Sequence, residues 1–172
     1  MISWHYFFHI VISALFSIKF TIERQNCRFN AYQSFKEWLE KKIHKTFPDT
    51  ESPIRLVAWS DDVPALLRAS DAYVLSSNYE GWGRVIIEAM AAGLPVVTTD
   101  VGCAGEVLLD TVHGTVVPVD NQPALTQALV ELSTDTLLYR SYVQNLQKLD
   151  LQTIPGTQRS EYGKQWVATL AI

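Results

Sequence analysis

The chain has 172 residues, of which 48% are apolar, 11% aromatic and 19% charged. This length and apolar content suffice for the core of one ordinary domain, and two full domains are not expected. The 14 basic and 18 acidic residues give a net charge of −4, which argues against a protein that binds nucleic acid by neutralising its phosphates. The two cysteines, Cys27 and Cys103, form no C-x-x-C motif, so neither a disulfide scaffold nor a structural zinc site is predicted.

The N-terminal segment 1–30 is atypical. Residues 4–20 are strongly apolar, but the run contains polar residues and is shorter than the roughly 20 apolar residues of a membrane-spanning helix. No basic residue precedes the run, so a secretory signal peptide is a poor match. Ile18, Phe20 and Ile22 alternate with polar residues, which favours a strand in a buried sheet. Membrane insertion, or a segment that was not selected to fold here, are the alternatives.

The remainder, 31–172, reads as one domain in which strands and helices alternate. Before the helix that Pro64 begins, Asp61 and Asp62 are placed to cap it rather than to bind a metal. The last part, 138–172, is predicted to be helical in two pieces. Since the strands are apolar without alternation, both faces of a parallel sheet are covered, and the predicted class is α/β, doubly wound. Strands are expected at 55–59, 72–77, 94–100 and 115–119, and helices at 31–47, 85–93, 105–110 and 123–132.

A glycine-containing loop carries the predicted chemistry. Gly81, Trp82, Gly83 and Arg84 lie between a predicted strand and the helix at 85–93. Glycines let backbone N–H groups approach a ligand, and a helix N-terminus adds unpaired donors and a partial positive charge. Ligands of open parallel sheets bind beyond the carboxyl ends of the strands, where this loop is expected. The loop is therefore a candidate cradle for a phosphate or diphosphate, and the alternative is an ordinary tight turn.

Two glutamates frame this loop. Glu80 is expected at the carboxyl rim of the strand, and Glu88 about one turn into the helix, among apolar residues. A carboxylate in such surroundings is costly to bury unless it accepts hydrogen bonds, and the hydroxyl groups of a sugar or ribose are suitable donors. The alternative is that Glu88 points outward as an ordinary solvated residue of the helix.

The run YEGWGRVIIEAMAAGLPVVTTDVGCAGEV resembles the nucleotide-sugar-binding motif of retaining glycosyltransferases with the two-domain GT-B architecture, of the family 4 or group 1 type. The E-x7-E signature of that family is matched by Glu80 and Glu88, and HGTVVPVDN resembles its stretch before the last helix. The resemblance covers about 55–135, and the tail at 157–168 more faintly resembles the family's closing helix. It implies a Rossmann-like, doubly wound parallel sheet, the C-terminal half of such an enzyme, with 31–172 as the nucleotide-sugar-binding domain and its helical tail.

The resemblance also implies roles for the residues of the loop. The implied reaction transfers a sugar from a nucleotide-diphosphate sugar to an acceptor with retention of configuration and without a metal or other cofactor. Glu88 would accept hydrogen bonds from the ribose, Glu80 would contact hydroxyls of the donor sugar, and the loop amides would face the diphosphate or sugar. Glu80 is expected to position the sugar rather than attack it. The candidate catalytic residues are thus Glu80 and Glu88, and the candidate donor-binding residues are Gly81, Trp82, Gly83, Arg84 and Glu88.

Some features of the family have no counterpart in the sequence. No acceptor-binding domain is recognised, and Arg24, Arg28, Lys41 and Lys42 lie in no context that matches the family's phosphate-binding basic pair. We therefore expect the chain to need an acceptor domain on a separate chain; the alternatives are a non-catalytic nucleotide-sugar-binding fragment and a sugar-nucleotide epimerase. The implied partners are a nucleotide-sugar donor and an acceptor sugar or lipid-linked saccharide, as in polysaccharide biosynthesis, and no nucleic acid. The expected location is the cytoplasm, either free or peripheral at the inner face of the membrane.

Two further side chains are expected to have structural roles. Cys103 has no neighbouring His or Lys in the sequence to lower its pKa, so it is expected to be a small residue near the loop rather than a reactive thiol. His113 precedes a glycine and is expected in a polar turn rather than as a catalytic base.

Overall fold

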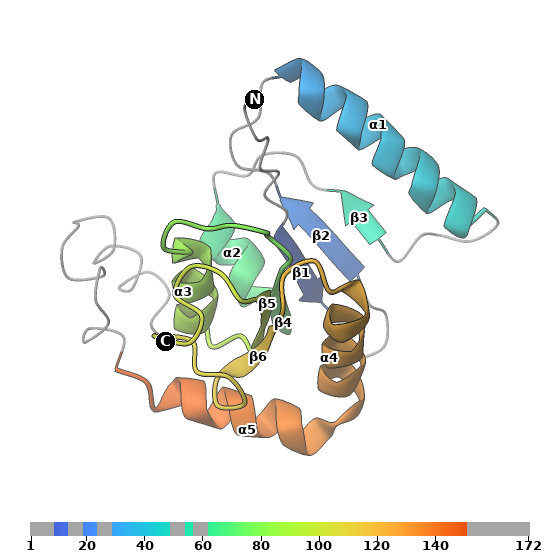
Figure 1. The fold of residues 1–172 in the computed structure, drawn as a ribbon. Helices are drawn as coiled ribbons and strands as arrows, with labels where there is room; N and C mark the ends of the chain where they lie inside the picture. Colours follow the sequence, from blue (N-terminus) through green and yellow to red (C-terminus); the bar gives the residue numbers. More distant parts are fainter. Residues whose placement is uncertain (1–8, 14–18, 24–28, 49–53, 57–61, 151–172) are drawn as a thin grey trace.

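A computed structural model of the chain describes residues 9–13, 19–23, 29–48, 54–56 and 62–150 (Figure 1). Within these residues, six strands form one sheet in the order β3-β2-β1-β4-β5-β6. The elements are, in chain order, β1 (His9–Ser13), β2 (Lys19–Glu23), α1 (Phe29–Thr46), β3 (Ile54–Leu56), α2 (Val63–Arg68), β4 (Ala72–Leu75), α3 (Arg84–Ala91), β5 (Val96–Thr99), β6 (Gly114–Val117), α4 (Gln122–Thr134) and α5 (Thr136–Gln147).

The half of the sheet formed by β4, β5 and β6 is parallel throughout. Val97 is paired with Val74 on one side and with Thr115 on the other. Every residue of β4 and β5 is buried, as expected for strands that are covered on both faces. The two threonines that end β5 donate their hydroxyl groups to backbone carbonyl oxygens. The predicted α/β class with a doubly wound parallel sheet is therefore confirmed in this half.

Helices cover both faces of the parallel half, and each face has its own core. From β4, Tyr73 and Leu75 point into the core under α3, whereas Ala72 and Val74 point into the core under α4. The two helices lie on opposite sides of the strands (Figure 1). Successive side chains of a strand point to opposite faces, so a four-residue strand supplies two residues to each core.

The hairpin β1–β2 makes the sheet mixed rather than purely parallel. β1 runs antiparallel to both of its neighbours, with Ile10 opposite Ile22 of β2 and Val74 of β4. A parallel connection would need a crossover of a dozen or more residues, and only residues 14–18 separate the two strands. The strand predicted around residues 18–22 is confirmed, and β1 lies within the apolar run at 4–20. Residues 1–8 and 14–18 of that segment lie outside the described residues.

Most of the predicted boundaries agree with the structure. α1 corresponds to the helix predicted at 31–47, and Asp62 caps α2 by accepting a hydrogen bond from the N–H of Ala65 at 3.0 Å. Gly93, with a φ of +74°, follows the end of α3 in the left-handed conformation that commonly ends helices. In the described ranges, no helix has both the length and the apolar character needed to cross a membrane.

One prediction on secondary structure is wrong, and several others fall on residues that the structure does not describe. The helix predicted at 105–110 is wrong, because this segment consists of turns and isolated bridges that join Ala104 to Leu108 and Asp110 to Gly114. The first helical piece of the C-terminal part is α5, which ends at Gln147. The second piece, the tail at 157–168, the end of the strand at 55–59, Asp61 and Cys27 lie outside the described residues.

Candidate functional site

Three loops meet at the carboxyl edge of the parallel strands. The hydroxyl of Thr99, the last residue of β5, donates a short hydrogen bond to the carbonyl oxygen of Ser77, which follows β4. The amide of Asn78 donates to the carboxylate of Asp120, after β6, at 2.8 Å. These contacts tie the loop that precedes α3 to the ends of both neighbouring strands, so its position is set by the sheet. Thr99 and Asp120 lie within the runs that resemble the family, but no role in the site was predicted for either of them, nor for Ser77 or Asn78.

Glu80 lies half-buried in this loop. Its Oε1 accepts a hydrogen bond from the hydroxyl of Ser77 at 2.9 Å, and Ser77 itself is buried. Burial raises the pKa of the Glu80 carboxyl above its usual value, and the Ser77 hydrogen bond partly offsets this by favouring the charged form. The expected position at the rim of the strand is thus matched by a carboxylate that is held in place and partly shielded from water.

The N-terminus of α3 follows the loop and has no side-chain cap. Gly83 is its N-cap residue, with a φ of +70°, and no side chain caps the helix there. The N–H of Ile86 donates to the Gly83 carbonyl oxygen at 2.9 Å, but the first amides of the helix have no side-chain acceptor from the cap, and the helix dipole adds a partial positive charge at this end. A Cβ added to Gly81 would meet no atom within 4 Å, so the chain leaves space beside the loop at that residue. Arg84, the first residue of α3, is exposed.

Glu88 lies one turn further along α3. It follows Arg84 by four residues, so the two side chains belong to the same stripe of the helix. Its neighbours Ile87 and Ala89 are buried, whereas Glu88 is partly exposed. The sequence left open whether Glu88 is buried among apolar residues or points outward into solvent. The structure shows an intermediate position, because Glu88 is neither enclosed in the core nor fully exposed.

Trp82 fills the space under the loop. It is partly buried and packs against the core on the α3 side, as expected for a residue that packs rather than reacts. Its indole Nε1, however, is buried and has no hydrogen-bond partner among the described residues. A buried donor without an acceptor costs free energy, so this indole reduces the stability of the fold.

A second glycine loop, after β5, packs directly against the first. A Cβ on Gly102, whose φ is +60°, would lie 2.9 Å from the carbonyl carbon and oxygen of Trp82. The Cys103 thiol, fully buried, lies 3.9 Å from the carbonyl oxygen of Gly83. Burial raises the pKa of Cys103 to about 11, so the thiol is protonated at neutral pH, which is in keeping with the predicted structural role.

His113 also has a structural role. It lies in the turn before β6, as expected, but it is buried, and its Nδ1 accepts a hydrogen bond from the N–H of Leu109 at 3.3 Å. Burial lowers the pKa of His113, which favours the neutral ring. Across the part of the chain that is described, no group of three or more His, Cys, Asp or Glu side chains is arranged to hold a metal ion.

Comparison with known proteins gives consistent similarities. The profile of a family described as "Glycosyl transferases group 1" matches residues 5–149. A phosphatidyl-myo-inositol mannosyltransferase of Mycobacterium leprae (strain TN) is 39% identical over 93 residues, which are 52% of this chain and 25% of that protein. The UDP-Gal:alpha-D-GlcNAc-diphosphoundecaprenol alpha-1,3-galactosyltransferase of Escherichia coli is 28% identical over 98 residues, 57% of this chain and 25% of that protein. The matched residues thus span about a quarter of the length of these relatives.

Solved structures share the fold. The C-terminal domain of the group 1 family protein LpcC from Francisella tularensis superposes with a TM-score of 0.60 at 29% identity, over 70% of this chain and 61% of that one. HepE from Anabaena, in complex with UDP and glucose, superposes with a TM-score of 0.62 at 23% identity, over 83% of this chain and 35% of that one. The first match also agrees with the predicted C-terminal half of a two-domain enzyme.

Proposed function

Because the chain belongs to the group 1 glycosyl transferases, we propose that it binds a nucleotide-diphosphate sugar at the loop between β4 and α3. The observation that carries the proposal is the N-terminus of α3, which no side chain caps and which lies between two partly buried carboxylates, Glu80 and Glu88. Two parts of such a ligand are thereby matched: the partial positive charge of the helix end suits the anionic diphosphate, and the carboxylates suit hydroxyl groups that donate hydrogen bonds.

We assign the roles of the site residues as follows. The amides of Gly81 to Arg84 face the diphosphate or the sugar, Glu88 accepts hydrogen bonds from the ribose hydroxyls, and Glu80 accepts them from the donor sugar. The half-buried position of Glu80 and its Ser77 hydrogen bond support a carboxylate held ready to accept, rather than one that rotates freely in water. The structure of a relative in complex with UDP-glucose, at 25% identity, is in keeping with a donor of this class.

The proposed reaction is transfer of the sugar with retention of configuration. The bond between the anomeric carbon and the diphosphate oxygen breaks, and its electron pair leaves with the nucleoside diphosphate. The oxygen of an acceptor hydroxyl bonds to the anomeric carbon on the same face, and the hydroxyl proton passes to the leaving diphosphate oxygen. The amides and the dipole of α3 stabilise this growing negative charge before the reaction starts, so they lower the barrier without having to reorganise. Glu80 positions the sugar while its anomeric carbon becomes positively charged.

Transfer also requires an acceptor to be held against the anomeric carbon with water excluded. The matched residues span only about a quarter of the curated relatives, so we propose that an acceptor-binding domain outside the described fold supplies this part. The names of those two relatives include a diphosphoundecaprenol and a phosphatidyl-myo-inositol, and we propose a sugar or lipid-linked saccharide as the acceptor class here. We further propose that 31–172 forms the nucleotide-sugar-binding domain, whose sheet is completed by β1 and β2 of the segment 1–30.

The test is calorimetric titration of UDP-glucose and GDP-mannose into the full chain and into Glu88→Ala. Loss of a hydrogen bond to a charged group is worth about 1.5–3 kcal/mol, so affinity for the bound donor should fall roughly 10- to 100-fold. Glu131→Ala, which removes an exposed glutamate from α4, is the control and should bind like the wild type. Absence of binding by the wild type to either nucleotide sugar, or equal affinity in Glu88→Ala, would show that the site is wrongly assigned.

A further inference from the structure

Helix α1 lies at the β3 edge of the sheet (Figure 1). It lies beside β2 and β3, away from α3 and the candidate site (Figure 1). Its sequence, FNAYQSFKEWLEKKIHKT, holds four lysines and two glutamates, a net charge of +2 in a chain whose net charge is −4. Positive charge is thus concentrated on one element of an acidic protein.

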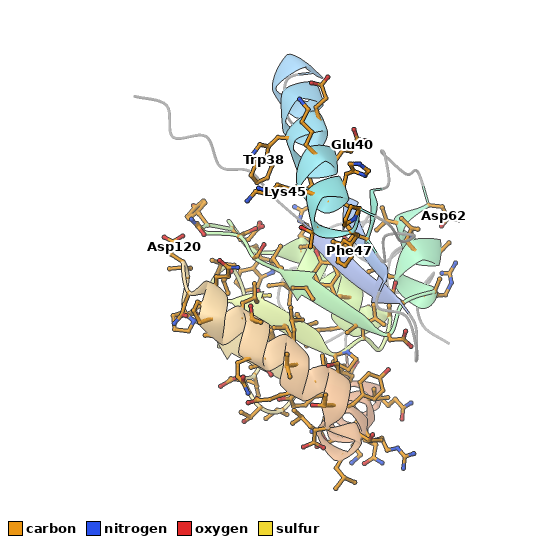
Figure 2. The ribbon with its side chains drawn as sticks, turned by 90° about the vertical axis from the view of Figure 1, so that its right-hand side faces the viewer. Trp38, Glu40, Lys45, Phe47, Asp62 and Asp120 are labelled. Atoms are coloured by element: carbon orange, nitrogen blue, oxygen red, sulfur yellow. The ribbon has the colours of Figure 1, made fainter. Side chains whose placement is uncertain are left out.

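The lysines of α1 gather around one exposed tryptophan. Trp38 is followed by Lys41, Lys42 and Lys45 at spacings of three, four and seven residues, which places all four side chains on one face of the helix. Trp38 is 48% exposed, and the three lysines are exposed as well. Figure 2 shows Trp38 on one side of α1 and Glu40 on the opposite side. We call the four residues Trp38, Lys41, Lys42 and Lys45 the Trp/Lys face.

Within the Trp/Lys face, the tryptophan ring lies close to a lysine ammonium group. The Lys42 ammonium lies 4.7 Å from the centre of the Trp38 ring, within the range of a cation–π contact. Leu39, Ile43 and Phe47, which follow one another by four residues on a neighbouring face, are only half-exposed. These apolar residues are therefore less exposed than Trp38, whose large ring remains in contact with solvent.

We propose that the Trp/Lys face binds the surface of a bilayer that contains anionic lipids. Tryptophan is enriched at the level of lipid headgroups because its ring is apolar and its N–H polar, and lysines on an amphipathic helix are attracted to anionic headgroups. The face satisfies both demands within two turns, and its charge is opposite to that of the lipids. α1 lies on the membrane in this arrangement and does not cross it, in agreement with the lack of a spanning helix in the described ranges.

The test measures flotation of the full chain with phosphatidylcholine vesicles that contain or lack phosphatidylglycerol. We expect binding only to the anionic vesicles and weaker binding at high salt, because salt screens exposed charges. Each lysine near an anionic surface contributes about fivefold in affinity, so Lys42→Gln/Lys45→Gln should bind about thirtyfold more weakly. Arg140→Gln/Lys148→Gln, which removes the same charge from exposed residues elsewhere, should bind like the wild type.

A second pair of variants separates the tryptophan from the charges. Trp38→Gln should weaken vesicle binding, whereas Leu137→Gln, which replaces an apolar residue that is 79% exposed at the start of α5, should not. Equal loss in the two charge variants, no binding by the wild type, or dimerisation that Trp38→Gln abolishes in the absence of vesicle binding would each overturn the proposal. Because α1 lies away from α3, the two proposals are tested independently. Vesicle binding can fail while donor binding persists, and donor binding can fail while vesicle binding persists.

Discussion

At the scale of single residues, burial and one hydroxyl group compete over the protonation of Glu80. Burial raises the pKa of this carboxyl, and the hydrogen bond from Ser77 acts in the opposite direction. In the folded chain the acid form is therefore favoured relative to an unfolded chain, so ionisation of Glu80 lowers the free energy of unfolding as pH rises through its pKa. A carboxylate that reduces stability at neutral pH is typical of a functional site rather than of a structural one.

Ser77→Ala tests this balance. Loss of the hydroxyl removes the contribution that lowers the pKa of Glu80, so that pKa should rise further, and donor binding should be lost on acidification at a higher pH than in the wild type. The measurement is donor affinity as a function of pH, together with a carbon NMR titration of the Glu80 carboxyl. Ser133→Ala, at an exposed serine of α4, is the control. If donor affinity falls at the same acidic pH in the wild type and in Ser77→Ala, the positioning role of Ser77 is contradicted.

At the scale of elements, the sequence predicts those whose signals are local. α1 follows from apolar residues at spacings of three and four, and α2 follows from Asp62 and Pro64, which act within one turn. The segment 105–110 has a helix-like composition, yet the amides of Glu106, Val107 and Leu108 all donate to the carbonyl oxygen of Cys103, which closes a turn instead of starting a helix. At the end of the segment, the N–H of Val116 in β6 donates to the Asp110 carboxylate at 2.8 Å. Such a competing bond is set by the strand that arrives later, so composition alone does not predict it.

The same reasoning separates the site into a predictable and an unpredictable part. The two glutamates and the Gly81–Arg84 loop were recognisable because they form one continuous motif. Asp120, with a φ of +55°, holds Asn78 from 42 residues away, and Ser77 acts through a hydrogen bond rather than through a motif position. Nothing local marks these residues as neighbours, since the strand order of the sheet brings them together.

Gly102 should matter more to the site than its backbone conformation alone predicts. Gly102 and Gly105 both have positive φ values, of +60° and +82°, but only a Cβ at Gly102 would contact the Trp82 carbonyl, whereas one at Gly105 meets nothing within 4 Å. An L-residue in the left-handed region costs about 1–2 kcal/mol, the expected loss for Gly105→Ala. Gly102→Ala should lose more than this and should also weaken donor binding, because the Trp82–Gly83 backbone must move.

Chemical denaturation and donor titration of both variants check this expectation. Equal losses of stability with unchanged donor affinity would mean that the steric contact of Gly102 with the loop is unimportant. A weakened donor affinity in Gly105→Ala alone would point to the wrong glycine. The pair is well matched because both substitutions impose the same change in side chain on a positive φ.

At the scale of the whole molecule, the two cores are joined by shared elements. Tyr142 of α5 belongs to the core under α4, and Leu146, one turn later, belongs to the core under α3. The strands β4 and β5 likewise supply side chains to both. Disruption of one face of the sheet should therefore release the other, so we expect the parallel half to unfold as one cooperative unit.

Leu132→Ala measures how far this coupling extends. Leu132 is 6% exposed in the core under α4, and a buried Leu→Ala change costs about 2–5 kcal/mol. If the faces unfold together, the free energy of unfolding measured with urea should fall by this amount. Hydrogen exchange should then accelerate equally in α4, in the central strand β4, and in α3 on the opposite face. Leu137→Ala, at a residue that is 79% exposed, should change stability by no more than about 0.5 kcal/mol. Faster exchange restricted to α4 and α5, with α3 still protected, would show that each face of the sheet unfolds independently.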